Sequence, residues 1–334
     1  MRVLVAGGAG YIGSHACKAL AQAGHLPIVY DNLATGHAWA VKWGPLEQGD
    51  LNDPAVLGAV LRRHRPDAVM NFAGLINVGE SVKEPTPYYR ANVASMITLL
   101  ETMRVHGVGL IVFSSSCATY GMPQRLPIVE TMAQNPINPY GRTKRMAEEI
   151  LRDACAAHGL GAVALRYFNA AGADAEGELG EEHDPETHLI PLVLQAALGV
   201  RRSISVFGTD YETPDGTCIR DYVHVADLAA AHVAALSACR GGQYSAYNLG
   251  TGQGVSINDV IGRSRAITGR AIPTEAAARR PGDPASLIAD ASLARKVLKW
   301  DPVCSDIDNI IRSAWRWMTE HRLRVTGGSD QAGR

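Results

Sequence analysis

A tyrosine and a lysine four residues apart, Tyr140 and Lys144, are the pair in this sequence best suited to proton transfer. They follow Asn138-Pro139, a typical helix start, and four residues advance a helix by slightly more than one turn, so the two side chains share a face. Lowering the pKa of a tyrosine from about 10 to about 7 requires roughly 4 kcal/mol. One cation about 4 Å away, at an effective dielectric constant near 20, supplies about that much. The pair therefore predicts that Tyr140 is a general base.

The same spacing is also common in ordinary amphipathic helices, where a lysine lies along an apolar surface. A run of serines favours the catalytic interpretation. Ser114, Ser115 and Ser116 end an apolar segment that is typical of a strand. Ligands of doubly wound sheets bind beyond the carboxyl ends of the strands, so a hydroxyl there can orient a substrate alcohol or relay its proton.

A glycine-rich segment near the start of the chain indicates phosphate binding. Residues 7–13 lie between an apolar run and a helical pattern, and Gly7, Gly10 and Gly13 permit a tight turn, close backbone approach and tight helix packing. The helix N-terminus then presents N–H groups to a pyrophosphate. Asp31 ends the next apolar run, near the ~20-residue offset expected for the carboxylate that binds the adenosine ribose. A carboxylate there would repel a 2′-phosphate, which favours NAD over NADP.

Asp50 is a second acidic residue at the end of a short strand-like segment. Its side chain could contact the adenine edge of the dinucleotide. It could equally serve as a helix cap for the segment that starts at Asp53-Pro54. The residue types leave both interpretations open.

The elements that must position these residues alternate between strands and helices. Continuous apolar runs lie at residues 3–6, 28–31, 68–73, 110–114 and 162–168, and helical patterns lie at residues 12–23, 55–64, 87–106 and 139–158. Apolar runs without alternation are expected for strands that helices cover on both faces. We therefore predict an α/β fold with a Rossmann-type, doubly wound parallel sheet.

The pattern changes after about residue 172. A loop of acidic and turn residues covers residues 174–185, and shorter segments follow at residues 204–208, 222–225 and 247–250. We predict an NAD-binding domain over residues 1–172 and a smaller, mixed α/β C-terminal lobe over residues 173–334 that binds substrate. Parts of residues 218–250 are expected to rejoin the first domain.

Charge and composition exclude several classes of function. The 334 residues carry a formal net charge of -1, which gives no basic field for nucleic acid or a membrane surface. No apolar run reaches the ~18 residues of a membrane span, and the chain opens on a strand-like run rather than a signal peptide. The six cysteines form no CxxC pair, so we expect reduced thiols, no disulfide, no metal site and a cytoplasmic location.

The glycine loop, the serine after a central strand and the Tyr140/Lys144 pair together resemble the extended short-chain dehydrogenase/reductase family. In that family a serine, a tyrosine and a lysine form the catalytic set. The resemblance implies that Ser116, the third serine of its run, joins Tyr140 and Lys144 in that set.

Further stretches resemble one branch of this family, the UDP-galactose/UDP-glucose 4-epimerases. They lie at residues 72–74, 78–81, 166–169, 207–211, 215–225, 247–250 and 280–283. The run at residues 215–225 is the most specific, and the resemblance extends from residue 1 to about residue 320. Sugar-nucleotide dehydratases are similar too, but they carry a Thr-Asp-Glu acid/base motif where this chain reads Cys117, Ala118 and Thr119.

The resemblance implies two sets of binding residues. Cofactor-binding residues would be Gly7, Gly10, Tyr11, Ile12, Gly13, Asp31, Asn32, Asp50, Leu51, Phe72, Ala73, Gly74, Asn92, Ser114, Tyr140, Lys144 and Tyr167. Substrate-binding residues would be Ser116, Tyr140, Asn169, His188, Leu189, Arg220, Tyr222, Arg280, Asp283 and Leu287. Arg220 and Arg280 could neutralise a pyrophosphate with bidentate contacts, although each taken singly could also form a structural salt bridge.

Several positions depart from the pattern of relatives. Ile76 stands where some relatives have a lysine that contacts the cofactor, so we expect weaker cofactor retention. Ala118 replaces a frequent threonine, and His188 replaces a substrate-binding asparagine. Leu287 stands where a small residue goes with acceptance of N-acetylhexosamines and tyrosine with their exclusion. Leucine is intermediate in volume, so we expect N-acetylated substrates to react slowly.

The resemblance implies reversible 4-epimerisation of UDP-glucose and UDP-galactose through a transient 4-keto sugar, with NAD as the bound cofactor. Two alternatives stay open. The chain could act on a UDP-N-acetylhexosamine or a UDP-pentose, or it could be a non-catalytic NAD-binding module. The intact set of Ser116, Tyr140 and Lys144 argues against the binding module.

The helix expected near residues 89–103 has apolar residues on more than one face. Tyr89, Val93, Met96 and Leu100 share one face, and Tyr88, Ala91 and Leu99 lie towards another. One face can cover the sheet and the other needs a partner. Relatives pair through this helix and the one that carries the catalytic tyrosine, so we expect a homodimer.

Overall fold

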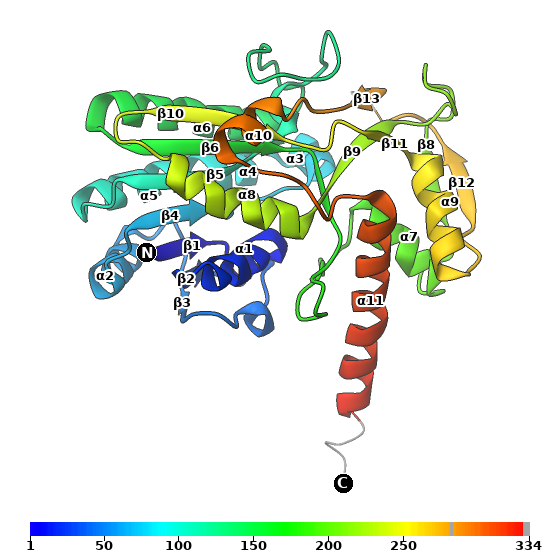
Figure 1. The fold of residues 1–334 in the computed structure, drawn as a ribbon, viewed down its shortest axis with the longest axis horizontal. Helices are drawn as coiled ribbons and strands as arrows, with labels where there is room; N and C mark the ends of the chain where they lie inside the picture. Colours follow the sequence, from blue (N-terminus) through cyan, green and yellow to red (C-terminus); the bar gives the residue numbers. More distant parts are fainter. Residues whose placement is uncertain (281–282, 330–334) are drawn as a thin grey trace.

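Seven parallel strands form the central sheet, in the order β10-β6-β5-β4-β1-β2-β3 (Figure 1). The computed structural model describes residues 1–280 and 283–329; part of the predicted substrate lobe, residues 281–282 and 330–334, lies outside the described residues. The strands are β1 Arg2–Ala6, β2 Leu26–Asp31, β3 Leu46–Gln48, β4 Ala68–Asn71, β5 Leu110–Ser116, β6 Gly161–Tyr167 and β10 Tyr244–Leu249. The predicted Rossmann-type sheet is confirmed.

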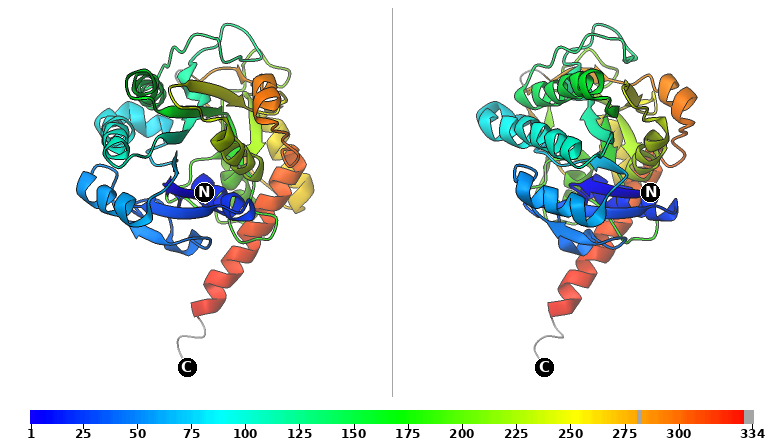
Figure 2. Two further views of the ribbon diagram at one scale, coloured as in Figure 1. Left: turned by 60° about the vertical axis from the view of Figure 1, so that its left-hand side comes forward. Right: turned by 90° about the vertical axis from the view of Figure 1, so that its left-hand side faces the viewer.

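Helices cover both faces of this sheet, as the continuous apolar runs predicted (Figure 2). On one face lie α1 Tyr11–Gln22, α8 Val225–Ala238 and α10 Ser292–Leu298, and on the other lie α2 Pro54–His64, α5 Ser95–Val105 and α6 Pro139–His158. Successive strand side chains point to opposite faces. Val3 and Val5 therefore enter the first core, while Leu4 and Ala6 enter the second.

The predicted helix over residues 87–106 is divided into three pieces. A short helix α4, Pro85–Tyr89, leads into a π-helical turn, Arg90–Ala94, before α5 begins, and α3, Val78–Lys83, precedes them. A π-helical turn shifts the phase of the residues that follow it. Our grouping of Met96 on one face with Tyr89, Val93 and Leu100 was therefore wrong. Met96 is fully buried beside Leu99, and Ile97 takes its place with 43% exposure.

The smaller lobe is built around β9, Ile219–His224 (Figure 1). This strand pairs with β7 Asn169–Ala171, β11 Gly254–Ser256 and β13 Ser286–Leu287. A second pair is formed by β8 Ile204–Phe207 and β12 Thr274–Ala277, beside helices α7 Leu189–Ala197, α9 Ile257–Thr268 and α11 Ile307–Ser329. Between β9 and β11 the chain returns to the large sheet as α8 and β10.

Within residues 1–280 and 283–329, no helix is both long enough and apolar enough to cross a bilayer.

Candidate active site

A cavity of about 1120 Å³ opens where the carboxyl ends of the large sheet meet the smaller lobe. Every residue that we predicted to bind cofactor or substrate lines this cavity, with the exception of Asn92. Residues from strand ends that are far apart in the sequence thus share one space. Parallel strands place their carboxyl ends at one edge of the sheet, which is why the glycine loop and the serines meet there.

Asn92 lies behind the cavity wall instead of in it. Its amide donates to the Leu75 carbonyl at 3.0 Å and to Thr143 Oγ1 at 3.0 Å, and its Oδ1 accepts from the Leu75 N–H at 2.8 Å. A Cβ atom on Gly74 would lie 2.6 Å from that Oδ1. Asn92 therefore holds the loop after β4 against α6, so its contribution to a cofactor pocket would be indirect.

The glycine loop has the shape that close approach to a pyrophosphate requires. Gly7 has a φ of +76°, and a Cβ atom on it would lie 2.6 Å from the Ala73 nitrogen. A Cβ atom on Gly13 would lie 2.2 Å from the Gly7 carbonyl oxygen. Gly10 is the N-cap of α1 and offers no capping side chain to the first-turn N–H groups. These residues fit a dinucleotide whose phosphates lie at the N-terminus of α1.

Asp31 combines a structural role with a place in the cavity wall. Its Oδ2 accepts from the Ala9 N–H at 2.9 Å and its Oδ1 from the Leu33 N–H at 2.8 Å. The carboxylate thereby ties the end of β2 to the glycine loop. Each oxygen has a further lone pair, so the group can still accept from a ribose hydroxyl.

Asp50 faces the same end of the cavity. Its carboxylate accepts from the Asn52 N–H at 2.8 Å and from the Asn32 amide at 3.1 Å. The bond from the Asn52 N–H lowers the pKa of Asp50 most. The helix cap that we considered for Asp50 is supplied by Asp53, which accepts from the first N–H groups of α2. The contact of Asp50 with an adenine edge stays a prediction.

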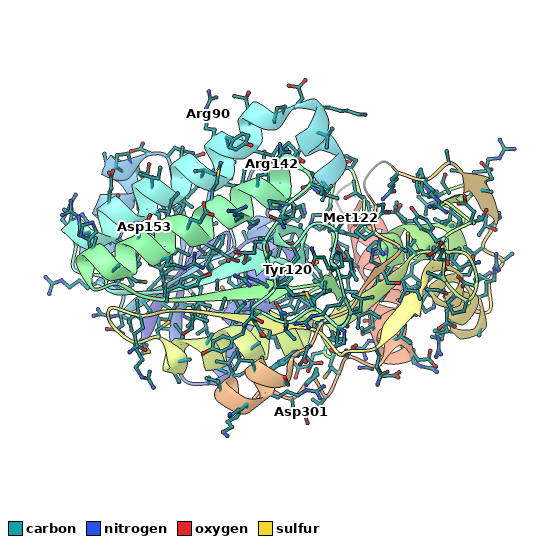
Figure 3. The ribbon with its side chains drawn as sticks, turned by 90° about the horizontal axis from the view of Figure 1, so that it is seen from above. Arg90, Tyr120, Met122, Arg142, Asp153 and Asp301 are labelled. Atoms are coloured by element: carbon teal, nitrogen blue, oxygen red, sulfur yellow. The ribbon has the colours of Figure 1, made fainter. Side chains whose placement is uncertain are left out.

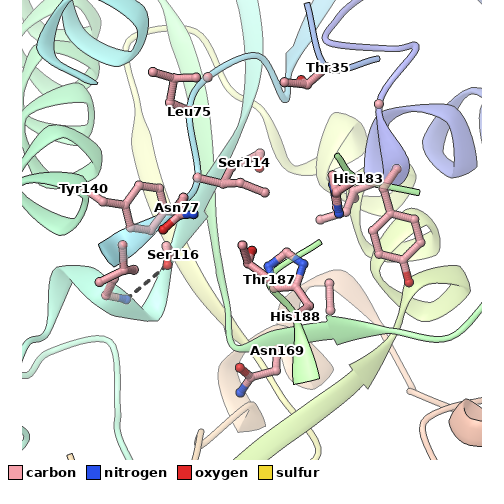
Figure 4. Close-up of a pocket in the computed structure, with 18 of the residues that line it drawn as sticks. Thr35, Leu75, Asn77, Ser114, Ser116, Tyr140, Asn169, His183, Thr187 and His188 are labelled. Atoms are coloured by element: carbon pink, nitrogen blue, oxygen red, sulfur yellow. Dashed lines mark hydrogen bonds between the residues drawn. The ribbon is translucent and has the colours of Figure 1, made fainter. Parts of the chain in front are cut away.

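The three serines at the end of β5 divide between the two faces of the strand. Ser114 and Ser116 line the cavity, while the hydroxyl of Ser115 donates to the buried carboxylate of Glu148 on the other side. Ser114 is already engaged, because its hydroxyl pairs with Tyr167 and its carbonyl accepts from Lys144. Ser116 faces Tyr140, and its hydroxyl oxygen accepts from the Ala118 N–H at 3.1 Å (Figure 4).

Tyr140 and Lys144 share one face of α6 and both are buried. The Nζ atom of Lys144 donates to the Ser114 carbonyl at 2.9 Å and lies 5.9 Å from the centre of the Tyr140 ring. Burial lowers the pKa of Lys144 to about 8. Burial and then the neighbouring Tyr167 raise the pKa of Tyr140, although a hydrogen bond with Ser116 acts in the opposite direction.

This result corrects our electrostatic argument from the sequence. We assumed a full cation about 4 Å from the phenol in a medium of moderate dielectric constant. In the folded chain, burial disfavours both the phenolate and the ammonium. Lys144 alone therefore does not bring the pKa of Tyr140 towards neutrality, and a further positive group close to the phenol is needed for Tyr140 to act as a base.

A buried polar network that the sequence did not reveal lies next to Tyr140 and Lys144. Glu148, one helical turn after Lys144, pairs with Arg166 at 2.6 Å, and both side chains are at most 3% exposed. Arg166 also donates to the Tyr120 hydroxyl at 2.8 Å. Lone glutamates and arginines in a helix or strand give no signal of such a pairing. The network fixes α6 and β5, which carry the predicted catalytic residues, relative to β6.

The opposite end of the cavity carries the arginines. The guanidinium group of Arg220 on β9 pairs with the carboxylate of Asp283. The guanidinium group of Arg280 lies 4.0 Å from the centre of the Phe207 ring. Asp283 therefore orients Arg220 as well as facing the cavity. Both arginines line the cavity, where they could reach a pyrophosphate.

The remaining predicted substrate residues surround these arginines. Leu287 on β13 is the register partner of Arg220 on β9, and it packs partly against a small core cluster. Asn169 on β7 is the register partner of Tyr222 and donates its amide to the Asp221 carbonyl at 3.0 Å. His188 is the N-cap residue of α7, directly before Leu189. Four separate segments thus form this end of the cavity.

Three further residues, Glu181, His183 and Glu186, line the cavity beside His188, and our sequence interpretation missed them. The signal that could have revealed them is the spacing Glu-x-His-x-x-Glu-x-His in the loop before α7. From the sequence we interpreted residues 174–185 only as a loop of acidic and turn residues.

A Rossmann-type sheet that places a buried tyrosine and lysine beside a glycine loop defines a nicotinamide-dependent enzyme of the short-chain dehydrogenase/reductase type. Residues 3–250 match the NAD dependent epimerase/dehydratase family, and the chain belongs to that family.

Similar proteins span nearly the whole chain. A UDP-glucose 4-epimerase of Rhizobium leguminosarum bv. trifolii is 53% identical over 94% of this chain and 96% of its own length. The crystal structure of a Brucella ovis UDP-glucose 4-epimerase in complex with NAD has 54% identity, a TM-score of 0.91 and coverage of 94% of this chain and 97% of that one. A Stenotrophomonas maltophila UDP-glucose-4-epimerase with bound NAD and formylated UDP-arabinopyranose has 40% identity, a TM-score of 0.92 and coverage of 97% and 99%.

Proposed function

We propose that this chain interconverts UDP-glucose and UDP-galactose by inverting the configuration at C4, with NAD as its cofactor. The observation that supports this most is the continuity of the cavity. Ser116 and Tyr140 lie between the glycine loop at one end and Arg220 and Arg280 at the other. A dinucleotide and a sugar nucleotide would thus meet at Tyr140. The relatives described above are UDP-glucose 4-epimerases.

The chemistry assigned to the chain's own residues is proton transfer and positioning. Tyr140 would remove the proton from the O4 hydroxyl of the sugar and return it after inversion. Ser116 would orient that hydroxyl or relay its proton. NAD, when bound, supplies a reversible hydride acceptor for C4 and a positive ring close to Tyr140. Burial raises the pKa of Tyr140, and a positive charge close to the phenol would lower it.

The substrate end of the cavity suits an enzyme that must present both faces of one sugar. Arg220, Arg280 and Asn169 would hold the uridine diphosphate. The hexose would then be tethered through its phosphates while its 4-keto form turns over. Charged side chains that hold the diphosphate agree with this requirement, because they leave the hexose itself free to turn.

In the same proposal, the two lobes bind different ligands. The large sheet with α8 and β10 would bind NAD. The lobe around β9, together with the loop before α7, would bind the sugar nucleotide. Residues 1–172 supply most of the first part, and residues 173–334 most of the second.

A homodimer completes the proposal. Tyr89, Val93, Ile97 and Leu100 form an apolar stripe that stays partly or fully exposed along the helix. Seen from above in Figure 3, α5 lies beside α6, on which Met146 is 39% exposed. A second copy could cover both helices. Light scattering at micromolar concentration should give twice the mass of the chain, and the mass of one chain would contradict the dimer.

The substrate assignment is tested with a panel of sugar nucleotides. Purified protein with added NAD should convert UDP-galactose to UDP-glucose faster than it converts UDP-N-acetylglucosamine or a UDP-pentose. Faster turnover of an N-acetylated sugar or a pentose would reassign the substrate. Absence of turnover with every member of the panel would leave only a binding module.

A further inference from the structure

Two glutamates and two histidines converge on one point in the cavity wall. The ligand atoms of Glu181, His183, Glu186 and His188 all lie within 4.8 Å of one another. Both glutamate side chains are nearly buried, at 5% and 6% exposure. In Figure 4 the side chains of His183 and His188 lie across the pocket from Tyr140 and Ser116. All four residues come from one short loop before α7.

The separations between these atoms suit a small cation at their centre. The Nδ1 atom of His183 lies 3.3 Å from the nearer oxygen of Glu181 and 3.6 Å from that of Glu186. The Nδ1 atom of His188 lies 2.6 Å and 3.7 Å from the same two carboxylates. Ligands about 2.1 Å from a tetrahedral zinc ion are about 3.4 Å apart. Of these four separations, the 2.6 Å hydrogen bond between His188 and Glu181 is the one that would have to lengthen most.

A second observation concerns His183 itself. Its Nδ1 atom is buried and meets the carboxylates of Glu181 and Glu186 at 3.3 and 3.6 Å, with no well-aligned hydrogen bond within the described part of the chain. A buried polar atom without a well-aligned hydrogen bond is uncommon in native structures. Glu186 is also preoriented, because its Oε1 accepts from the backbone N–H groups of Thr187 and His188 at 2.7 and 2.9 Å. Support of this kind around a ligand carboxylate is typical of metal sites.

A neighbouring cluster on the same loop shows the contrasting arrangement. Asp174, Glu176 and Glu178 surround the ammonium group of Lys18 at 2.8, 2.7 and 2.8 Å. The protein itself supplies the cation there. Among the residues that the structure describes, the salt bridges of Glu181 and Glu186 are with the two histidines and with no lysine or arginine.

We propose that Glu181, His183, Glu186 and His188 bind one divalent transition-metal ion, with zinc as the best match. Two imidazole nitrogens and two carboxylates are ligands that zinc accepts, and they offset the charge of a dication. Four protein ligands make the site closed and structural. The ion would fix the loop before α7 and the N-cap of that helix, which form one wall of the sugar-nucleotide end. This proposal does not depend on the epimerase activity.

Metal content of the purified full-length chain tests the proposal. After chelator treatment, incubation with zinc and removal of free metal, the protein should retain about one zinc per chain. His183→Ala and the isosteric Glu186→Gln should each retain less than ~0.1. Glu176→Gln, a carboxylate of the Lys18 cluster, is the matched control and should retain as much as the unmodified chain. Circular dichroism establishes that each variant is folded.

Two further measurements on the same proteins decide the geometry and the energetics. Cobalt in place of zinc should give the visible absorption bands of a tetrahedral site, and His183→Ala should lose them. Zinc should raise the melting temperature of the unmodified chain and of Glu176→Gln, but not that of His183→Ala. Equal zinc content in the unmodified chain and His183→Ala would overturn the proposal. Failure of the unmodified chain to retain zinc would also overturn the proposal. The four residues would then form only a network of ion pairs.

Discussion

The two ends of the cavity are built by different means. At the cofactor end the backbone forms the surface: glycines without room for a Cβ atom, a helix N-terminus and strand ends from a single parallel sheet. At the sugar-nucleotide end side chains form it, and other side chains orient them, as Asp283 does for Arg220 and Glu181 for His188. The shape of the first end is therefore set mainly by the backbone, whereas the shape of the second depends on individual side chains. Four predictions test this contrast.

The largest effect is expected at the junction of the two ends. Tyr140→Phe removes the only phenolic oxygen proposed to exchange the O4 proton, so activity should fall by at least about 100-fold. NAD should remain bound, because the glycine loop and Asp31 are untouched. Epimerisation rate and bound NAD are measured on the same preparation. Tyr88→Phe removes another buried hydroxyl, one bonded to Glu80, and should leave most of the activity. Retention of more than a few per cent of activity in Tyr140→Phe would exclude it as the base.

A substitution at the sugar-nucleotide end should alter the binding of the substrate and leave the binding of NAD unchanged. Arg220→Met removes a cation that we propose contacts the pyrophosphate, so the KM for UDP-galactose should rise about 10- to 100-fold. The affinity for NAD should not change. Arg279→Met is the matched control, because Arg279 lies outside the cavity lining in an exposed pair with Asp210, and such pairs contribute little. Equal KM values for the two variants would remove Arg220 from the substrate site.

At the cofactor end we expect the opposite pattern: a change in NAD affinity without a change in substrate binding. Asp31→Asn loses the carboxylate charge at the proposed ribose site, so NAD should bind about 10-fold more weakly and NADP should be rejected less strongly. The KM for UDP-galactose at saturating NAD should stay the same. Asp67→Asn offers a control, since that carboxylate also accepts a backbone N–H but lies outside the cavity lining. Unchanged NAD affinity and NADP rejection would show that Asp31 does not contact the ribose.

The last prediction concerns the choice between hexose and N-acetylhexosamine substrates. Leu287 lies in the cavity wall on the strand next to Arg220, and an overpacked pocket costs about 1–3 kcal/mol, or roughly 5- to 150-fold in specificity. Leu287→Cys should raise the ratio of N-acetylhexosamine to hexose turnover, and Leu287→Tyr should lower it. The ratio of kcat/KM values for the two substrate types measures this. The same ratio in all three proteins would mean that Leu287 does not select the substrate.

The contrast between the two ends also accounts for what could be predicted from the sequence. The strands, α1 and the glycine loop follow from local patterns, because continuous apolar runs are typical of covered parallel strands and closely spaced glycines between a strand and a helix are typical of a phosphate loop. The positions of Arg220 and Leu287 came only from resemblance, since no local rule brings β9 and β13 together. The pairing of Glu148 with Arg166 had no sequence signal at all.

Two differences between prediction and structure have clear physical causes. Met96 was assigned to the wrong face of the helix because the π-helical turn at Arg90–Ala94 shifts the residues after it. The pKa of Tyr140 was predicted from charge alone, and burial reverses the direction of its shift. In both cases the competing effect arises from tertiary structure, which a local pattern does not contain.

In the proposed mechanism, C4 of the UDP-hexose loses and regains the same hydride within this cavity. UDP-galactose that carries deuterium at C4 is incubated with the purified protein and NAD in ordinary water, and the UDP-glucose formed is examined by NMR and mass spectrometry. We expect the product to keep the deuterium at C4. Exchange of that deuterium for hydrogen from the solvent would contradict the proposed mechanism, because inversion would then proceed by removal of a proton from carbon.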